Sequence, residues 1–444
     1  MKVSVITIGC KVNQSESASI EGELIQKGHE IVEYTDSPDA CIINTCTVTA
    51  KSDYQSRQMI RRAVKSGARV IATGCYAQLR PGELSKIKGL NLILGNSEKS
   101  TLLNHICRTS PKKNTSEESI VQTSANPSIS VHSPESPVRL QSYYSKRTRA
   151  FLKIQDGCNF SCSYCTVPKA RGKSRSLDHE DLLRAVDIFS QDGYREIILT
   201  GIHIGSYGSD LKPKSTLVKI VRELTSTYPD IRFRLSSLEP QEFRGEFLSL
   251  MKKGHICPHL HIPLQSGSDR LLKAMKRRYN TSFFENLING IVAAYPGISI
   301  GTDIIIGFPG EGDDDFNSTA KLLERLPLSY IHVFPFSERP DTAAAEMKGK
   351  VREEIKKNRV KRILEIAQTK KNKYFISQLG KELNVIVEEK LTTNGFYRGI
   401  SGNYIRPFIQ SSNLKLGQTV LVRAVSFVDG SLMSIPSEER TNIK

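Results

Sequence analysis

The sequence predicts an α/β protein with three folded parts: a doubly wound parallel sheet, a partial (β/α)6 barrel and a small closed β-barrel. Three observations support this prediction. The chain has 444 residues, which is too long for one ordinary hydrophobic core. Apolar, strand-like runs alternate with helix-like segments as far as about residue 345. From about residue 376 the pattern changes to short strands separated by glycine-containing turns.

The predicted doubly wound domain covers residues 1–108. Its strands are expected near 2–8, 31–35, 40–44, 69–73 and 91–94, and its helices near 14–28, 49–66 and 97–108. This alternation is typical of a parallel sheet with helices on both faces. Residues 109–141 are rich in Ser, Pro, Asn and Thr. Because such a segment cannot bury enough apolar surface to order itself, it is expected to be a flexible linker.

The predicted barrel domain covers residues 142–375. Its strands are expected near 151–155, 196–200, 231–235, 259–263, 299–306 and 330–335, with helices between them such as 178–192 and 214–227. About six β-α units predict an open, partial barrel instead of a complete one with eight strands. The domain ends in a segment rich in Lys and Arg, 349–374, which is expected to form a basic amphipathic helix.

The third predicted domain covers residues 376–440. Short strands are expected near 383–389, 396–400, 403–408, 418–425 and 431–435, with turn signals such as Asn394-Gly395 and Asp429-Gly430 between them. A small closed β-barrel is the natural arrangement for strands of this length.

The composition indicates a polyanionic partner. The formal net charge is +17, which favours nucleic acid because such a charge attracts phosphates regardless of sequence; ordinary solubility charge is the alternative. No apolar run approaches the roughly 20 residues of a membrane span, and the N-terminus begins as a strand instead of a signal peptide, so a cytoplasmic protein without membrane contact is expected. Nine cysteines, an odd number, indicate metal or catalytic thiolates instead of a disulfide framework.

One cysteine triplet, Cys158, Cys162 and Cys165, stands in the run IQDGCNFSCSYCTVP directly after an apolar strand. Thiolates are the usual ligands of iron-sulfur clusters, and a 4Fe-4S cube held by three of them keeps one iron free to bind something else. A zinc site is the alternative, but zinc needs a fourth ligand at short spacing, and the next candidate, His179, lies far downstream. The spacing therefore favours an iron-sulfur cluster with an open site.

A second triplet, Cys10, Cys46 and Cys75, follows three different apolar strands. Because the carboxyl ends of parallel strands meet at one edge of a sheet, these residues are expected to converge and to hold a second cluster. The alternative is that each is a small buried apolar residue, which is a common fate of free cysteine. The remaining cysteines are interpreted as structural: Cys41 in a strand core, Cys107 in helix packing and Cys257 at a strand entrance.

Taken together, the six cysteines in this order, the run GCKVNQSES around Cys10 and the C-terminal barrel resemble the methylthiotransferase family of radical S-adenosylmethionine enzymes. The resemblance covers almost the whole chain outside the linker. It implies a cofactor-binding 4Fe-4S cluster at Cys158, Cys162 and Cys165, an auxiliary 4Fe-4S cluster at the other triplet, and an RNA-binding TRAM domain at the end. Members add a methylthio group at an unactivated C–H bond, mostly on the adenosine beside a tRNA anticodon, and consume two S-adenosylmethionine molecules for each product.

Three runs point to one branch of this family. GCKVNQSES, IQDGC and HLHIPLQSGSD (259–269) resemble the branch that acts on threonylcarbamoyladenosine more than the branch that acts on isopentenyladenosine, whose usual forms are nearer GCQMN and MEGC. The run ERPDTAAAEM (338–347) departs from the Gly-Thr-Pro loop common in relatives, and Phe160 and Ser161 also differ from frequent choices. The alternatives are an isopentenyladenosine enzyme, an enzyme acting on a ribosomal protein, and a non-catalytic iron-sulfur protein that binds RNA.

The S-adenosylmethionine pocket is expected at the carboxyl ends of the barrel strands. Small or polar residues that follow the strands, together with the aromatic residue of the cysteine loop, are the candidates: Tyr164, Gly201, Ser236, Glu239, Gln265, Asp303 and Gly307. Each of them can equally be a turn or cap residue. His203 and His261 are interpreted as packed or hydrogen-bonded neighbours, not as metal ligands.

The expected partners are tRNA and a reductant such as flavodoxin or ferredoxin, and the chain is expected to act as a monomer. A basic loop directly after the cysteine run, formed by Lys169, Arg171, Lys173 and Arg175, is one candidate contact for RNA phosphate. A solvated run of charges is an equally good explanation of this loop.

Overall fold

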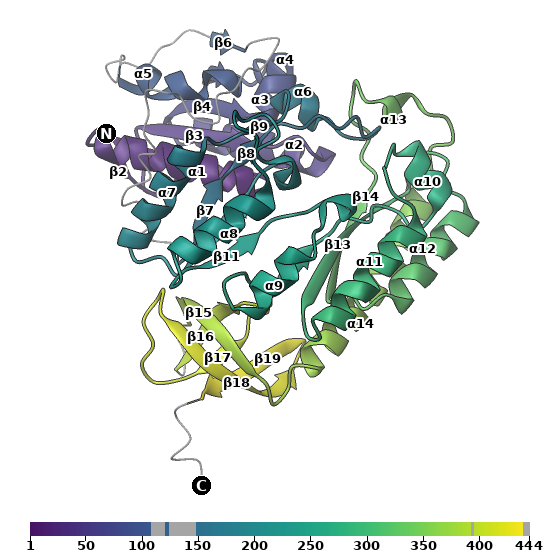
Figure 1. The fold of residues 1–444 in the computed structure, drawn as a ribbon. Helices are drawn as coiled ribbons and strands as arrows, with labels where there is room; N and C mark the ends of the chain where they lie inside the picture. The colour runs from purple at the N-terminus through teal and green to yellow at the C-terminus, as the bar shows by residue number, and fades with distance from the viewer. Residues whose placement is uncertain (108–119, 124–147, 392–394, 438–444) are drawn as a thin grey trace.

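The computed structural model describes residues 1–107, 120–123, 148–391 and 395–437. It shows three folded parts joined in one body, with the N-terminal sheet at one end, the partial barrel in the middle and the C-terminal β-barrel at the other end (Figure 1). This is the α/β architecture that the sequence predicts. Among the described residues, no helix is both long and apolar enough to cross a membrane.

The N-terminal sheet has six parallel strands in the order β2-β1-β3-β4-β5-β6. They are β1 (Lys2–Thr7), β2 (Glu30–Ile31), β3 (Ala40–Thr45), β4 (Arg69–Gly74), β5 (Leu90–Leu94) and β6 (Ile120–Gln122). Helices α2 (Ala50–Lys65), α3 (Cys75–Leu79) and α4 (Pro81–Leu84) cover one face, whereas α1 (Lys11–Gln26) and α5 (Leu102–Cys107) cover the other. A short 3-10 helix, η1 (Ser97–Thr101), precedes α5. The sheet is therefore doubly wound, as predicted.

Two details of this domain differ from the prediction. The second strand is only Glu30–Ile31, because the chain turns before reaching the end of the expected 31–35. Strand β6 lies inside the segment expected to be a linker, where Ile120 and Val121 pair with β5 and extend the sheet by one strand. Most of the remaining predicted linker, and the packing predicted for the Cys107 side chain, lie outside the described residues.

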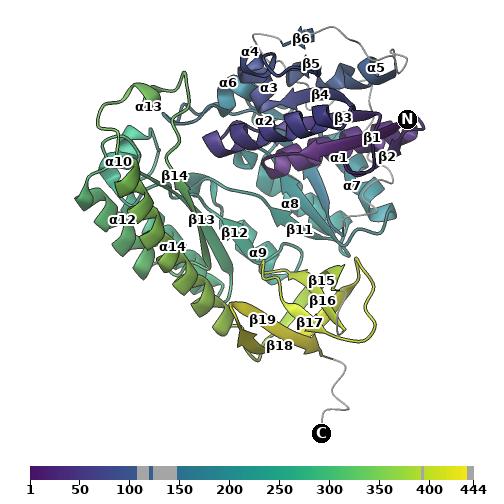
Figure 2. The same ribbon diagram turned by 180° about the vertical axis from the view of Figure 1, so that it is seen from behind.

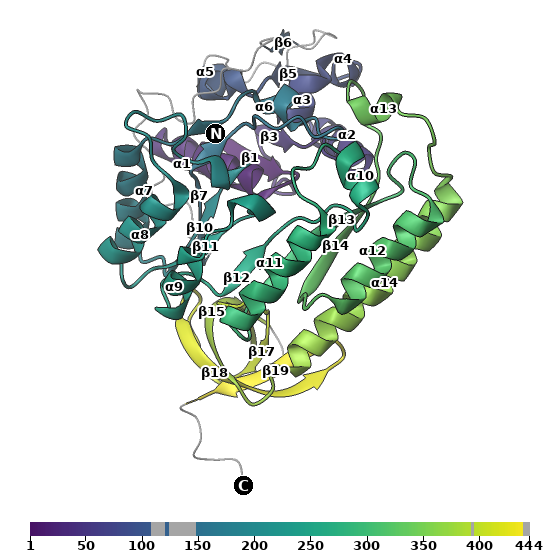
Figure 3. The ribbon, with the colours of Figure 1, turned by 45° about the vertical axis from the view of Figure 1, so that its right-hand side comes forward.

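The middle part has six strands in two parallel three-stranded sheets, β7-β10-β11 and β12-β13-β14, which adjoin through an isolated parallel bridge between Phe233 and Ile256. They are β7 (Ala150–Lys153), β10 (Glu196–Thr200), β11 (Arg232–Leu235), β12 (His259–His261), β13 (Ser299–Ile306) and β14 (Tyr330–Pro335). The helices between them surround the strands (Figure 3): α7 (His179–Gln191), α8 (Leu217–Thr227), α9 (Glu246–Lys252), α10 (Asp269–Ala274), α11 (Thr281–Ala294) and α12 (Asp313–Arg325). No pairing joins β7 to β14 in the described part of the chain, so the barrel is partial and open, as predicted.

The N-terminal domain contacts the chain on both sides of this opening. Helix α1 lies against β7, where the hydroxyl of Ser15 donates a hydrogen bond to the carbonyl oxygen of Phe151 at 2.9 Å. At the other side, the backbone N–H of Ala50 in α2 donates to the hydroxyl of Ser337, just after β14, at 2.9 Å. The edge of the N-terminal sheet that bears the carboxyl ends of β1, β3 and β4 is thereby held over the open barrel.

The long helix α14 (Glu353–Ile376) packs along β14 and leads into the C-terminal barrel (Figure 2). That barrel is closed by β15 (Glu382–Lys390), β16 (Phe396–Ser401), β17 (Phe408–Gln410), β19 (Ser431–Pro436) and β18 (Thr419–Val428). The predicted strand 403–408 is wrong. Tyr404 has a positive φ of 66° and Pro407 has no N–H to donate, so the chain turns there and pairing begins at Phe408.

Candidate functional site

The first cysteine triplet lies on a loop between strand β8 (Gln155–Asp156) and helix α6 (Val167–Arg171). Backbone hydrogen bonds fix the loop: the N–H of Cys158 donates to the oxygen of Gly172, and that of Cys165 donates to the oxygen of Cys162, both at 3.1 Å. The hydroxyl of Ser163 donates to the carbonyl oxygen of Ala274 at 2.9 Å, which anchors the loop to α10. The three thiols are half-buried and free of disulfide bonds.

Basic groups surround these thiols. The guanidinium of Arg277 donates to Sγ of Cys162 at 3.3 Å and pairs with the carboxylate of Glu239. The imidazole Nδ1 of His203 lies 3.8 Å from Sγ of Cys158, and its Nε2 lies 2.6 Å from Oε1 of Glu242. Burial disfavours the charged imidazole, but the contacts with Cys158 and Glu242 outweigh it and raise the pKa of His203 to about 9. Positive charge beside this loop favours the thiolate form that metal ligands require.

The second triplet lies at the carboxyl ends of three adjacent strands of the N-terminal sheet. Cys10 precedes α1, Cys46 follows β3, and Cys75 begins α3 directly after β4. The backbone approaches closely here: Gly9 has φ +113°, and a Cβ at this position would lie 2.6 Å from Cβ of Cys46, so only glycine fits. Burial, together with repulsion from Cys75 and Cys10, raises the pKa of the Cys46 thiol to about 12.

The donor set of each triplet fits an iron-sulfur cluster better than a single zinc ion. A tetrahedral zinc ion with Zn–S bonds of about 2.3 Å brings its sulfurs to about 3.8 Å from one another. Among the described residues, neither cysteine triplet brings all three sulfurs within 4.8 Å; the one trio of His, Cys, Asp or Glu that meets this limit is His261, Asp303 and His332. A cube with iron at four corners spreads its thiolate ligands more widely. Three thiolates that do not close around one ion therefore fit a cluster better than zinc.

The two cysteine loops are joined by direct contacts. Helix α3, which begins at Cys75, packs against α6, and the amide of Asn96 donates to the carbonyl oxygen of Ala170 at 2.8 Å. Arg171 donates from Nη1 to Oε1 of Glu16 at 2.8 Å and to Oδ1 of Asp156 at 3.0 Å. Its side chain is 1% exposed. The suggestion that Arg171 contacts RNA phosphate is therefore wrong: it connects the two loops, whereas Lys173 of the same run is exposed.

A cavity of about 210 Å³ lies between the two cysteine loops. Val48 and Thr49, which follow Cys46 closely, form one side, and Cys165 with Phe334 and Pro335 of β14 form another. Of the predicted pocket residues, Tyr164, Gln265 and Asp303 line this cavity. It continues into a second cavity of about 760 Å³, which shares Thr49 and residues 334–337 and contains Gly307, Lys51, Lys350 and Lys356 in its wall.

The other predicted pocket residues lie nearby in different roles. Glu239 holds Arg277, as described above, and Gly201 packs so closely that a Cβ there would lie 2.9 Å from the carbonyl oxygen of Gln155. Ser236 has a buried hydroxyl oxygen with no hydrogen-bond partner among the described residues, so it is free for a ligand. Sequence reasoning missed Arg277, because an arginine in the run KRR carries no sign of the thiol that it contacts.

His261 lies inside the barrel, where it is hydrogen-bonded instead of isolated. Its Nε2 lies 2.9 Å from Oδ1 of Asp303, and the same oxygen lies 3.2 Å from Nδ1 of His332. Tyr330 bridges on the other side, with its hydroxyl 3.1 Å from Nδ1 of His261 and 2.7 Å from Nε2 of His259. The contacts with His261 and His332 outweigh burial and hold the pKa of Asp303 below its usual range.

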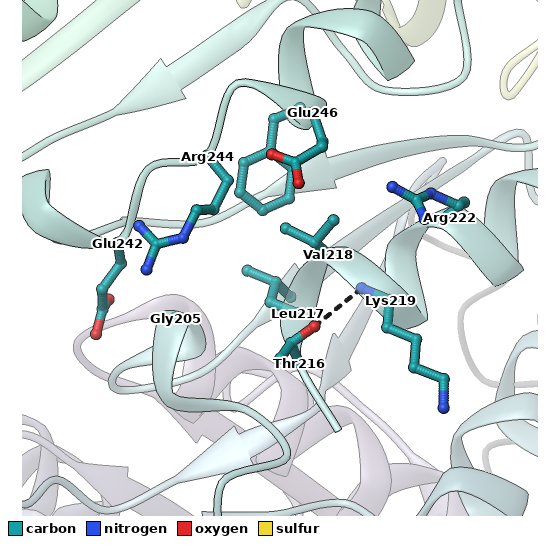
Figure 4. Close-up of a pocket in the computed structure, with 10 residues that line it drawn as sticks. Gly205, Thr216, Leu217, Val218, Lys219, Arg222, Glu242, Arg244 and Glu246 are labelled. Carbon is teal, nitrogen blue, oxygen red and sulfur yellow. Dashed lines mark hydrogen bonds between the residues drawn. The ribbon is translucent and has the colours of Figure 1, made fainter. Parts of the chain in front are cut away.

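A recess of about 410 Å³ lies on the outside of the barrel, beside α8 and α9. Figure 4 shows Arg244 and Glu242 on one side of it, and Arg222 and Lys219 of α8 on the other. Glu242 also pairs with His203, so this recess is separated from Cys158 by two side chains.

Comparison with known proteins agrees with this arrangement. Two family models match the chain: Radical SAM superfamily, over residues 152–323, and Uncharacterized protein family UPF0004, over residues 2–95. A relative from Aquifex aeolicus, named threonylcarbamoyladenosine tRNA methylthiotransferase MtaB, is 40% identical over 403 residues, which is 89% of this chain and 95% of the relative. A relative from Fusobacterium nucleatum, named tRNA-2-methylthio-N(6)-dimethylallyladenosine synthase, is 32% identical and covers 87% of this chain and 88% of its own length.

A solved structure resembles the fold. It is that of the radical S-adenosylmethionine methyltransferase TsrM from Kitasatospora setae with cobalamin and a 4Fe-4S cluster bound; it has a TM-score of 0.55 and 15% identity, and covers 78% of this chain and 77% of that one. At this identity the likeness concerns the fold alone. The close relatives match nearly their whole length, which excludes the non-catalytic alternative. The chain therefore belongs to the radical S-adenosylmethionine methylthiotransferase family and is a tRNA-modifying enzyme.

Proposed function

We propose that the enzyme converts N6-threonylcarbamoyladenosine beside the tRNA anticodon into its 2-methylthio form. One observation carries the choice of substrate: the Aquifex relative, named for this modified base, is 40% identical and matches over 95% of its length. The runs GCKVNQSES, IQDGC and HLHIPLQSGSD, which point to the same branch, lie at Cys10, before Cys158 and on β12, so all three border the site between the domains.

Cys158, Cys162 and Cys165 would hold the 4Fe-4S cluster that binds S-adenosylmethionine. When bound, this cluster supplies the electron that opens the cofactor. The protein's own part is to fix and shield the site. Arg277 neutralises charge at Cys162 and positions Glu239, while Tyr164, Gln265 and Asp303 line the adjoining cavity together with apolar side chains that exclude water. The unpartnered hydroxyl of Ser236 is a further candidate contact for the cofactor.

Cys10, Cys46 and Cys75 would hold the second 4Fe-4S cluster. Support comes from their convergence at one sheet edge and from the contact of α3 with α6, which brings this triplet beside the first one. A base that enters the cavity between Thr49 and Cys165 would then lie between the two clusters. This arrangement suits a reaction in which one centre activates a C–H bond and the other presents sulfur.

The tRNA would approach over the cavity of about 760 Å³, whose wall carries Lys51, Lys350 and Lys356. The net charge of +17 and the C-terminal barrel, which is consistent with a TRAM domain, support RNA binding. We further propose that the enzyme acts as a cytoplasmic monomer and receives electrons from flavodoxin or ferredoxin.

A reconstitution experiment tests the substrate. The anaerobically loaded enzyme, given S-adenosylmethionine and reductant, is incubated separately with tRNA that carries threonylcarbamoyladenosine and with tRNA that carries isopentenyladenosine. Mass spectrometry of the nucleosides should show the methylthio product from the first tRNA alone. Product from the second tRNA alone would assign the enzyme to the other branch, which is the second candidate function and is favoured by its 32% identity to the Fusobacterium relative.

A further inference from the structure

The inner wall of the barrel along β14 is open instead of filled. Tyr330, His332 and Phe334 alternate with Ile331, which is 6% exposed and packs in the core, so the three aromatic residues face the interior. Interiors of barrels of this kind are normally filled by side chains. Here the side chain of His332 is 53% exposed and Phe334 is 40% exposed. The wall meets the cavity beside Cys165 at Phe334 and Asp303, and Asp303 in turn contacts His261 and His332 further along the barrel.

At the Tyr330 end of this wall lies a group of residues from all three domains, which we call the lumen floor: Lys11, Arg234, His259, Tyr330 and Tyr404. The rings of His259 and Tyr404 stack with centroids 4.2 Å apart, and those of Tyr330 and Tyr404 are 5.9 Å apart. Nζ of Lys11 lies 5.5 Å from the centre of the Tyr404 ring, and the guanidinium carbon of Arg234 lies 5.1 Å from it.

The two cations of the lumen floor differ in their partners. Arg234 is fully paired: it donates from Nε to Oε1 of Glu196 at 2.8 Å and from Nη2 to the carbonyl oxygen of Ser401 at 3.0 Å. Lys11 is half-buried, and no carboxylate or carbonyl of the described residues accepts a hydrogen bond from its ammonium group or pairs with it. Partly removing such a charge from water is costly unless an anion compensates it.

We infer that Lys11 binds the carboxylate of the threonylcarbamoyl group and thereby selects this substrate; the inference rests on the proposed function. Lys11 directly follows Cys10, so it lies beside the second cysteine triplet. Phe334 at the cavity and Tyr330 at the lumen floor are four residues apart on β14, which corresponds to a distance of about 13 Å along the strand. The four bonds from N6 of the base to the carboxylate carbon span about 5 Å, so the purine itself must enter the barrel past Phe334 for its carboxylate to reach Lys11.

The remaining wall suits the rest of that substituent. The exposed imidazole of His332 faces the barrel interior, where it can hydrogen-bond the ureido or hydroxyl groups of threonylcarbamoyladenosine, whereas His261 and Tyr330 are already paired with Asp303 and His259. An isopentenyl group would leave the charge of Lys11 without an anionic partner. A site with polar groups that stay unpaired rejects the analogue that lacks their partners.

The test uses the holoenzyme and two forms of one tRNA, with threonylcarbamoyladenosine either as the free acid or as its methyl ester. Dissociation constants are measured without S-adenosylmethionine, and kcat/KM with it. The wild type should bind the ester about 10- to 100-fold more weakly, as expected for loss of a hydrogen bond between charged groups. Lys11→Met should bind the free-acid tRNA more weakly by a similar factor, and should bind acid and ester equally well. Lys11→Arg should restore the preference for the acid.

Lys51→Met is the matched control, because Lys51 is exposed in the wall of the larger cavity. It should weaken binding of acid and ester by the same factor. Iron content is measured for every variant, since Lys11 adjoins Cys10. Equal binding of acid and ester by the wild type would overturn the inference without any variant, as would unchanged discrimination in Lys11→Met. Failure of the wild type to modify threonylcarbamoylated tRNA at all would instead overturn the proposed function.

Discussion

Arg171 and Glu16 form a buried ion pair between the two cysteine-bearing domains, with Nη1 of Arg171 2.8 Å from Oε1 of Glu16. Glu16 belongs to helix α1, which begins directly after Cys10, and Arg171 ends helix α6, which follows Cys165. Lys99 and Lys153 also pair with Glu16, and Asp156 pairs with Arg171. The side chains of Arg171 and Glu16 are buried, so their charges depend on each other for compensation. The network therefore holds the two loops at a fixed separation.

Arg171→Leu should therefore destabilise the protein by about 3–5 kcal/mol, since it leaves Glu16 and Asp156 buried with less compensation. The free energy of unfolding is measured by chemical denaturation. Lys173→Leu serves as the control, because Lys173 lies two residues away and is exposed. If Arg171→Leu lowers the free energy of unfolding no more than the control does, the ion pair does not join the domains.

The carboxylate of Glu196 should make the stability depend on pH. Burial would raise the pKa of Glu196, but Arg234, Arg232 and Arg149 outweigh it and hold the pKa well below its ordinary value of 4.5. A carboxyl group with a lowered pKa in the folded state stabilises the protein above its unfolded pKa, and this contribution is lost as the pH falls through the folded value. Glu196→Gln should thus cost about 3–5 kcal/mol at pH 7, and the difference from the wild type should narrow below about pH 4.5.

Denaturation midpoints between pH 7 and pH 4 check this prediction. Glu180→Gln is the control, because Glu180 is exposed in the first turn of α7. Its difference from the wild type should be small at every pH. A constant gap between Glu196→Gln and the wild type over the whole range would contradict the assignment of this group.

The two cysteine triplets should bind iron independently. The fully loaded enzyme should contain about eight iron atoms per chain, and alanine at all three residues of either triplet should remove about half of them. Loss of the triplet Cys158, Cys162 and Cys165 should abolish cleavage of S-adenosylmethionine, whereas loss of Cys10, Cys46 and Cys75 should retain cleavage and abolish methylthiolation. Cys257→Ala is the control, because its thiol is buried near Glu196 and should not change the iron content. Zinc, or only about four irons, in the wild type would refute two clusters.

The exposed basic face of α14 should contribute to tRNA affinity. Lys357 and Lys361 are exposed, whereas Arg359 is buried and pairs with Glu311 at 2.8 Å. Replacing both lysines by Gln should weaken binding, and each phosphate contact that is lost should flatten the log-log salt dependence by about 0.7–0.9. Filter binding over a series of salt concentrations measures the slope. An unchanged slope, or an equal change in the exposed control Lys27→Gln at the end of α1, would exclude a specific role for this face.

The sequence by itself determined the three folded parts and the positions of both cysteine triplets. Local patterns carry this information: strand and helix periodicity define the α/β units, and Cys10, Cys46 and Cys75 each follow a strand, so parallel pairing of β1, β3 and β4 suffices to bring them together. Short-range patterns were less reliable for edge elements. Strand β6 depends on pairing with β5, and the strand expected at 403–408 is displaced by the conformation of Tyr404 and by Pro407.

Only the tertiary structure decided which charged residues are structural and which face the site. Arg171, Arg277 and Lys11 look alike in the sequence, as basic residues with no marked partner. Their roles differ because Arg171 meets two buried carboxylates, Arg277 meets a thiol and Glu239, and Lys11 meets the ring of Tyr404 from a domain almost 400 residues away along the chain. A charge is defined by its partners and by its access to water, and both are set by contacts between distant segments.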